Sequence, residues 1–291
     1  MPARKRKKVK KNNIKIPRKV LVLFFIVISL FAAFFLFLTS SAIDSNKYVV
    51  AFQGESGDVQ VEIYDFSSGE IDVIDIPGDV YVNTAYGFGD WRIGSLGKLG
   101  NQEKYGGELL RMSIVKSFHF PVDAWVEGSR LSFNSNSSLS LKQKLQLLWF
   151  KLRTPVSKTS ETDLKNGGYL QETKLPDGDD GYALVRELPA SLGTKFTISW
   201  GEKRMPRVGI YNTTGGSGNT IHNLSEVIHI LGGDWVIVEK PPTENDCYVK
   251  GNNSALKEKL SKLLLCSIND ESVEGNFDIE IVVGQKFVER F

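Results

Sequence analysis

Two carboxylates stand where acidic side chains could do chemistry. Asp58 ends the turn-like stretch 52–58, and Asp79 follows a strand-like run that ends at Pro77. Carboxylates can hold a hard cation such as Mg²⁺, with water molecules completing its coordination shell. Acidic residues at the ends of strands are also common in structures without metal. A purely structural role for both residues is therefore the alternative.

The two cysteines, Cys247 and Cys266, are expected to form a disulfide bond. Cys247 begins a short predicted strand, and Cys266 ends a predicted helix that runs back along it. The strand and its turn cover about 20 Å in one direction, and about 12 helical residues cover about 18 Å in the other. The two ends should therefore meet, with two buried free thiols as the alternative. The histidines are too scattered for a triad or a zinc site: His119, His222 and His229.

The elements that must position the carboxylates alternate in type. The apolar run 48–52 and the alternating runs 59–64 and 71–76 predict strands, and the alternation of apolar and polar residues is typical of half-buried strands. A helix is expected near 107–118, where apolar residues recur at helical spacing, and a strand follows at 120–127. Strands and helices in this order predict a mixed α/β (α+β) fold.

A second helix is predicted over 141–152, and residues 154–193 are expected to be irregular and partly a linker. The helix is amphipathic, and such a helix usually packs its apolar face on its own domain. A helix that binds a partner or lies on a membrane surface is the alternative. The apolar face consists of Leu141, Leu145, Leu148, Trp149 and Leu152.

The last third of the chain predicts a β-α-β-β-α-β module. Its loop 212–219 is glycine-rich and precedes a helix, where backbone amides can hold a phosphate. The loop lacks both the Lys-Ser/Thr of a P-loop and the dinucleotide-binding spacing, so a chain-reversing turn is favoured. The expected elements are strand 207–211, helix 220–231, strands 235–239 and 247–249, helix 254–266 and strand 278–284.

The N-terminus predicts a membrane anchor. Residues 4–19 contain ten Lys or Arg and no acid, and the apolar run 20–38 follows directly. Nineteen helical residues span roughly 28 Å, close to the thickness of a bilayer core. The basic flank predicts a cytoplasmic N-terminus and an extracytoplasmic remainder. A cleaved signal peptide, with Ser40 and Ala42 near the cleavage site, is the alternative.

The ten cations of the tail explain the basic character of the chain. Subtracting them from the formal net charge of +2 leaves about −8 on the remainder. A nucleic-acid patch is the other use of such a tail, but a membrane span follows it at once. The acidic remainder does not predict a nucleic-acid partner.

Residues 52–59 and 74–125 resemble the catalytic domain of the LytR-CpsA-Psr family. The resemblance implies transfer of a glycopolymer from a polyprenyl pyrophosphate carrier to the bacterial wall, with arginines on the pyrophosphate and aspartates on a divalent metal. Asp58 and Asp79 match the aspartates, but Ser56 and Gly78 stand where the family has arginine. Arg92 is a candidate substitute cation, and a solvated surface arginine is the alternative.

The last third resembles the LytR C-terminal domain. Residues 212–214 (Asn-Thr-Thr) match its Asn-Gly-Thr-like loop, and 281–284 match its closing strand. Together the two resemblances predict five segments: a cytoplasmic tail (1–19), a transmembrane helix (20–43), a shortened LytR-CpsA-Psr-like domain (44–153), an irregular linker (154–204) and a LytR C-terminal-like domain (205–291).

These observations predict a non-catalytic binding or scaffolding protein of cell-envelope assembly, because both expected arginines are absent. Its expected partners are the membrane and a cell-wall polymer or polyprenyl-linked glycan. The alternative is a divergent phosphotransferase that uses Asp58, Asp79, Arg92 and Mg²⁺. An enzyme of that kind would need an apolar tunnel for the prenyl chain beside a cationic mouth.

Overall fold

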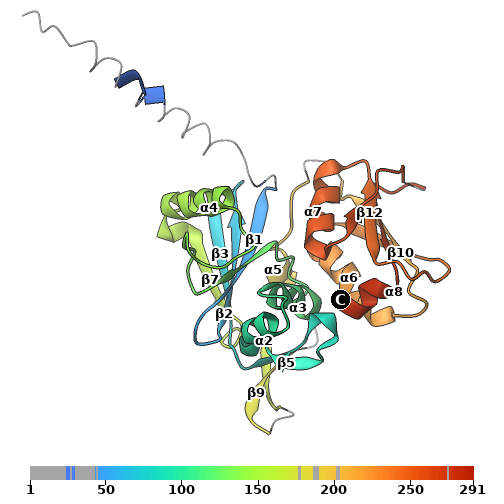
Figure 1. Cartoon of the computed structure of the whole chain (residues 1–291), viewed down its shortest axis with the longest axis horizontal. Coiled ribbons are helices and arrows are strands. Elements are labelled where there is room, and N and C mark those ends of the chain that lie inside the picture. The colour runs from blue at the N-terminus through green and yellow to red at the C-terminus, as the bar shows by residue number, and fades with distance from the viewer. Residues whose placement is uncertain are drawn as a thin grey trace, which may run out of the picture. The chain divides into compact units, whose positions relative to one another are not determined.

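The computed structural model describes residues 24–26, 28–29, 43, 45–175, 178–185, 190–200, 204–273 and 275–291. The predicted tail 1–19 and most of the predicted span 20–43 lie outside the described residues. Within the described part of the chain, no helix is both long and apolar enough to cross a bilayer. The chain divides into two compact units, Met1–Ser41 and Ala42–Phe291, and Figure 1 labels the elements of the second.

The first sheet is built on three antiparallel strands that the sequence predicts: β1 (Lys47–Gln53), β2 (Val59–Asp65) and β3 (Glu70–Ile76). Two further strands add at the edges in parallel, β6 (Ala124–Glu127) beside β1 and β7 (Thr159–Asp163) beside β3, in the order β6-β1-β2-β3-β7. Both faces of the sheet are covered, since its residues contribute to two separate hydrophobic clusters.

Helices cover the two faces of this sheet. On one face lie α2 (Leu96–Gln102) and the almost completely buried α3 (Glu108–Phe118), which matches the helix predicted near 107–118. On the other face lies α4 (Leu141–Arg153), whose Leu147 packs into the second cluster with Val50 and Phe52 of β1. The short 3-10 turns are η1 (Ala85–Gly87), η2 (Ile93–Ser95) and η3 (Val156–Lys158).

The orientation of α4 contradicts the prediction that its apolar face packs on its own domain. Leu141, Trp149 and Leu152 are 60%, 50% and 81% exposed, so this stripe is not part of the core. The opposite face, with Lys144 and Leu147, is buried. The orientation follows from polar contacts that periodicity cannot reveal, because the Lys144 ammonium donates to the carbonyls of Phe133 and Ser135 at 3.3 and 2.7 Å.

The segment 154–204, expected to be irregular, contains three strands. Besides β7 these are β8 (Leu170–Lys174) and β9 (Asp180–Leu184). They complete a second sheet with β4 (Val80–Asn83) and β5 (Asp90–Arg92), in the order β5-β4-β9-β8. A short helix, α5 (Ala190–Gly193), follows. The expectation of irregular structure is therefore wrong for these three strands, because β7 pairs with β3, β9 pairs with β4, and β8 pairs with β9.

The C-terminal sheet has the predicted element order. Strands β10 (Arg207–Asn212), β11 (Asp234–Glu239), β12 (Cys247–Gly251) and β14 (Ile279–Val283) alternate with helices α6 (Gly218–Ile230) and α7 (Ser254–Leu264) as expected. A two-residue strand, β13 (Ser267–Ile268), and a final helix, α8 (Gln285–Arg290), are additional. The sheet order is β11-β10-β14-β12-β13. The predicted Cys247–Cys266 disulfide is present, with its Cα atoms 5.0 Å apart.

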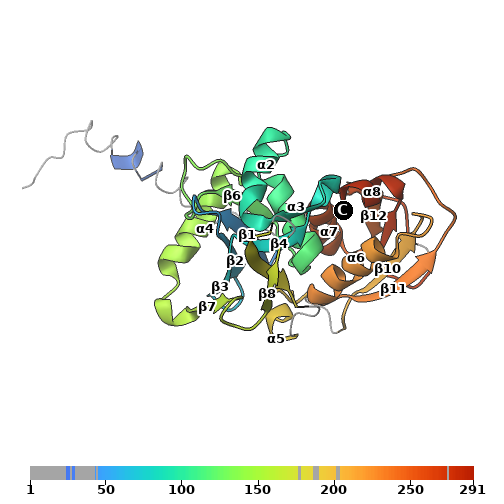
Figure 2. The same ribbon diagram turned by 90° about the horizontal axis from the view of Figure 1, so that it is seen from below.

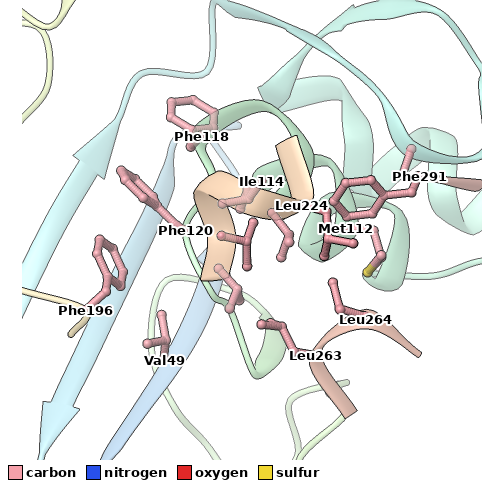
Figure 3. Packing of buried hydrophobic residues seen from close by; sticks show 14 of the residues in the cluster. Val49, Met112, Ile114, Phe118, Phe120, Phe196, Leu224, Leu263, Leu264 and Phe291 are labelled. Carbon is pink, nitrogen blue, oxygen red and sulfur yellow. The ribbon is translucent and has the colours of Figure 1, made fainter. Parts of the chain in front are cut away.

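One hydrophobic cluster joins the N-terminal sheets to the C-terminal sheet. Figure 3 shows Met112 and Ile114 of α3 among Leu224 of α6, Leu263 of α7 and the C-terminal Phe291. Both ribbon views place α3 at this junction (Figures 1 and 2). The N-terminal and C-terminal halves of the second unit therefore share a core.

Candidate functional site

Asp58 closes a tight turn between β1 and β2. The Gly54 amide donates to the Asp58 carbonyl at 2.9 Å, and Gly57 adopts a positive φ of 90° that suits glycine. One carboxylate oxygen of Asp58 accepts from the Gly78 amide at 2.9 Å, and the other accepts from the Ser56 hydroxyl at 2.9 Å. The carboxylate therefore holds the turn against the loop that carries Asp79.

Asp79 lies in that loop, directly before β4. Its carbonyl accepts from the Tyr182 amide at 3.2 Å, which attaches the loop to β9. The Lys165 ammonium lies 4.7 Å from the centre of the Tyr182 ring. The pKa of Lys165 is raised chiefly by the Tyr182 hydroxyl, with a smaller contribution from the charge of Asp79. Asp79 thus lies in a half-buried loop with the Lys165 ammonium nearby.

The Asp58 carboxylate accepts from the amide of Gly78, the residue that precedes Asp79. A magnesium site formed by the carboxylates of Asp58 and Asp79 stays a prediction. Across the described residues, no group of three or more His, Cys, Asp or Glu side chains is arranged to hold a metal ion. Mg²⁺ bound by two carboxylates alone would have to retain most of its water ligands.

An acidic cavity of about 330 Å³ opens beside Asp58. Among the described residues, three carboxylates contribute to its lining, and no cationic side chain does. Asp75 accepts from the side-chain amide of Gln60 at 2.8 Å, and Asp163 accepts from the backbone amide of Lys165 at 2.8 Å. We call this space the acidic cavity; it is lined by Phe52, Gly54, Ser56, Asp58, Val59, Gln60, Asp75, Ile76, Pro77, Ser129 and Asp163.

Three glycines from three loops meet next to the acidic cavity. A Cβ atom on Gly78 would lie 2.9 Å from the carbonyl carbon and oxygen of Gly57. A Cβ atom on Gly94 would lie 2.8 Å from the Gly78 oxygen, and the Gly94 amide donates to that oxygen at 2.9 Å. Backbone atoms therefore occupy the space in which a side chain at position 78 would begin. We call this the glycine contact.

The cations near the predicted site have other partners or point elsewhere. Arg92, the candidate substitute, pairs with Asp179 at 3.1 Å. Arg111 is buried, pairs with Glu108 at 2.5 Å and donates to the carbonyls of Val122 and Leu263. Both belong to structural networks, and neither lines the acidic cavity. Lys98 and Lys104 are exposed and are likewise absent from its lining.

The space between β6 and helices α2 and α3 is almost filled. Its cavity has a volume of about 20 Å³, which is the room needed by about one water molecule. The Trp125 ring occupies this region, because a Cβ on Gly107 would lie 2.2 Å from a ring carbon. Gln53 fills the neighbouring position and donates to the Gly94 carbonyl at 2.9 Å. A prenyl chain does not fit here.

A larger cleft of about 520 Å³ lies at the junction between the first sheet and α7. At its base Asp123 and Lys259 form a buried ion pair at 2.5 Å, and Asp123 also accepts from the Val49 amide at 2.8 Å. Burial, followed by the charge of Asp123, raises the pKa of Tyr48. The junction cleft is lined by Ile43, Ser45, Asn46, Tyr48, Asp123, Gln143, Ile198, Ser199, Trp200, Ser254, Ala255, Glu258, Lys259 and Lys262.

Sequence reasoning missed the junction cleft, since its residues come from five separate segments and carry no motif. The opposite charges of Asp123 and Lys259 are the available signal in the sequence, but these residues are far apart in the chain and their spacing does not predict an ion pair.

The glycine-rich loop 212–219 forms a turn, as favoured. The Thr214 amide donates to the Asn212 side-chain oxygen at 3.1 Å, and the Ser217 amide donates to the Thr214 hydroxyl at 3.1 Å. Gly215 and Gly216 adopt positive φ angles. Two of the amides that would hold a phosphate are thus already used within the loop.

No known protein-family profile and no curated protein matches the sequence. Solved structures resemble parts of it. TagT of Bacillus subtilis is 13% identical over 51% of this chain and 89% of that chain, with a TM-score of 0.38. TagV of Bacillus subtilis is 9% identical over 66% of this chain and 99% of that chain, with a TM-score of 0.38.

A third similar structure is a LytR-CPS2A-psr family protein, YwtF (TagT), with bound octaprenyl pyrophosphate lipid. It is 12% identical over 67% of this chain and 95% of that chain, with a TM-score of 0.38. Its family is the one that the sequence motifs resemble. Similarities of this size carry no argument about what the present chain binds or does.

Proposed function

We propose that this chain is a membrane-anchored, extracytoplasmic protein of bacterial cell-envelope assembly that binds or scaffolds envelope components without transferring a glycopolymer. The acidic cavity is the observation that carries the proposal. It lies where the sequence resemblance implies a pyrophosphate site, and the part of its lining that the structure describes contains three carboxylates and no cationic side chain.

Electrostatics opposes a pyrophosphate in this cavity. Proteins hold phosphate groups with arginine forks or helix N-termini, which supply positive charge and donors. Asp58, Asp75 and Asp163 would instead repel the anion, and the repulsion between like charges is stronger near protein than in bulk water. Phosphoryl transfer depends chiefly on positioning and charge neutralisation, so a site with this charge is poorly suited to it.

The glycine contact supports the same conclusion. An arginine fork at position 78 would need a side chain to start where the backbone of Gly57 already lies. The alternative function, a divergent phosphotransferase, would therefore depend on Mg²⁺ held by Asp58 and Asp79. It would also require Arg92 to leave its partner Asp179.

The junction cleft suits the binding role. Its volume lies in the range of ordinary ligand sites. Its charged side chains balance, because Lys259 pairs with Asp123, and Lys262 pairs with Glu258 at 3.3 Å. An uncharged polar chain such as a glycan segment would find both polar groups and the aromatic side chains of Tyr48 and Trp200 there.

The enzymatic alternative is tested by calorimetry of residues 42–291 with a short polyprenyl pyrophosphate, with and without Mg²⁺. We expect no binding under either condition. Micromolar binding that requires Mg²⁺ and is lost in Asp79→Ala would overturn the proposal in favour of the phosphotransferase.

The binding role is tested with soluble peptidoglycan fragments. Ala255 lines the junction cleft and is exposed, so Ala255→Trp fills the cleft without removing a core contact. We expect this variant to weaken binding roughly tenfold or more, the loss that follows when one side chain of this size blocks contacts. Lys286→Trp, at an exposed position of α8 outside the cleft, is the matched control. Equal binding by both variants would remove the cleft from the proposal.

A further inference from the structure

The apolar face of α4 is presented outward. At 3.6 residues per turn, the side chains of Leu141, Leu145, Leu148, Trp149 and Leu152 fall within a sector of about 100°. Val156, in the turn that follows, is 89% exposed. We call these six residues the α4 stripe.

The rest of α4 is fixed to the first sheet, so the helix cannot turn its stripe inward. Leu147 is fully buried, and Phe150 packs against Phe66 with ring centroids 4.8 Å apart. Lys151 pairs with the buried Glu62 of β2 at 2.5 Å. The helix begins with a capping box between Ser140 and Gln143, which favours a helix start at this point. The exposure of the stripe is therefore a property of the folded unit.

Positive charge surrounds the stripe. Residues 128–160 contain no acid, although residues 44–291 carry a net charge of about −8. Lys142 and Arg153 flank the stripe on one side of the helix, and the Arg153 guanidinium lies 5.5 Å from the centre of the Trp149 ring. Lys151 flanks it on the other side. The cations of this segment are Arg130, Lys142, Lys144, Lys151, Arg153 and Lys158.

Helix α4 is also close in space to the end of the predicted membrane span. Ile43, the last residue of that prediction, is buried in the same hydrophobic cluster as Leu147. The Phe66 amide donates to the carbonyl of Asn46 at 2.8 Å, and the Gln143 side chain donates to the Tyr48 hydroxyl at 3.2 Å. An extended chain covers about 3.3–3.6 Å per residue, so a few residues of linker span only a short distance. A membrane anchor that ends near Ile43 would therefore keep α4 within reach of the bilayer surface.

We propose that α4 lies in the interface of an anionic lipid bilayer, with the α4 stripe among the acyl chains and the flanking Lys142 and Arg153 at the headgroups. A helix with an apolar face, a cationic polar face and no acid has the composition that binds such interfaces. The contact would fix the orientation of the folded unit on the membrane. It rests on the membrane location in the proposed function and is independent of the choice between scaffold and enzyme.

The test uses residues 42–291, which form one compact unit containing both hydrophobic clusters and the disulfide. The native cysteines are paired, so a single Leu152→Cys can carry an environment-sensitive fluorophore. We expect co-flotation with vesicles in which about a third of the lipid is phosphatidylglycerol, and a blue-shifted probe that doxyl-lipids quench. Met205→Cys, also exposed but outside α4, is the control position and should remain unquenched.

Two charge variants complete the test. Leu152→Glu should weaken vesicle binding roughly tenfold or more, because one exposed leucine would no longer transfer from water to the bilayer. Met205→Glu should not change it. A Leu152 probe that stays in water when vesicles are present overturns the proposal. So does a probe that becomes buried without vesicles as protein concentration rises, because a second copy of the chain would then cover the stripe.

The anchor is tested separately with the full chain. If the full chain floats with vesicles and residues 42–291 do not, the membrane location stands and the role of α4 is overturned. If neither floats, the membrane location in the proposed function fails with it.

Discussion

Gly78 shows how a single residue changes what this site can do. The sequence resemblance implies an arginine here, but the glycine contact leaves no space for a Cβ atom. The φ angle of Gly78 is not among the positive ones, so the requirement for glycine is one of space alone. Glycine at position 78 therefore has two effects: it removes the expected guanidinium, and it lets the backbones of Gly57 and Gly94 pack against it.

Gly78→Ala should destabilise the protein by about 1–3 kcal/mol, the usual cost of overpacking, and Gly78→Arg should cost at least as much without creating pyrophosphate binding. Urea unfolding measures the first effect and calorimetry the second. Gly218→Ala is the matched control, since a Cβ there meets nothing within 4 Å. A Gly78→Arg protein that keeps wild-type stability would show that the loops separate more easily than their contacts imply.

His119 makes stability depend on pH. It ends α3 in the left-handed region, and its Nε2 lies 3.3 Å from the side-chain oxygen of Asn223. Burial lowers the pKa of His119 below its ordinary 6.5, although the contact with Asn223 acts in the opposite direction. The folded state therefore binds fewer protons than the unfolded state, so stability is complete above 6.5 and falls as the pH drops from there toward the folded pKa.

His119→Asn should flatten this dependence, because asparagine tolerates the left-handed conformation and does not titrate. The measurement is urea unfolding between about pH 5 and pH 8, the range in which histidine changes charge. His229→Asn, at an exposed position, should retain the wild-type slope. An unchanged slope in His119→Asn would assign the pH dependence to other groups.

At the scale of elements, the sequence predicts the strands and helices that can be identified from the pattern of their own side chains. Strand β1 is a continuous apolar run and β2 and β3 alternate, so all three are visible in the sequence, although both faces of their sheet are covered and the strands are not half-buried as the alternation predicts. Strands β7 and β8 are polar and lie at sheet edges, where the backbone of a neighbour defines them. No pattern within 159–174 could reveal such partners.

The candidate site divides in the same way. Spacing locates Asp58 and Asp79 in the chain, and the structure brings Asp58 to the loop of Asp79. The glycine contact and the acidic cavity arise from loops that are distant in sequence. They depend on tertiary approach, which the spacing of residues does not encode.

The disulfide joins the start of β12 to Cys266, the second residue after α7, closing a loop with a sequence separation of 19. Removing it as Cys247→Ala with Cys266→Ala should cost about 3 kcal/mol by the chain-entropy estimate. Urea unfolding of both proteins, with and without reductant, measures the loss. Reductant should lower the stability of the wild type and leave the double variant unchanged. Equal stability of the two oxidised proteins would show that the crosslink does not stabilise the sheet.

At the scale of the molecule, the two predicted domains share their core. Arg111 of α3 donates to the carbonyl of Leu263 of α7, and the buried pair of Asp123 and Lys259 also crosses the junction. Neither contact can be inferred from a sequence that looks like two consecutive modules. A buried ion pair is costly to break by removing one partner, so loss of either Asp123 or Lys259 would leave an uncompensated charge at the junction.

A shared core predicts that residues 42–291 unfold as one cooperative unit. Leu224 of α6 is fully buried at the junction, so Leu224→Ala should cost about 2–5 kcal/mol. Because the perturbation is on the C-terminal side, hydrogen exchange of the β1 and β2 amides reports whether it reaches the other half. In a cooperative unit these amides lose protection by the same free energy that urea unfolding measures.

Unchanged protection in β1 and β2, with reduced protection confined to β10, β12 and β14, would mean that the halves unfold independently. Met205→Ala, at an exposed position, should alter neither.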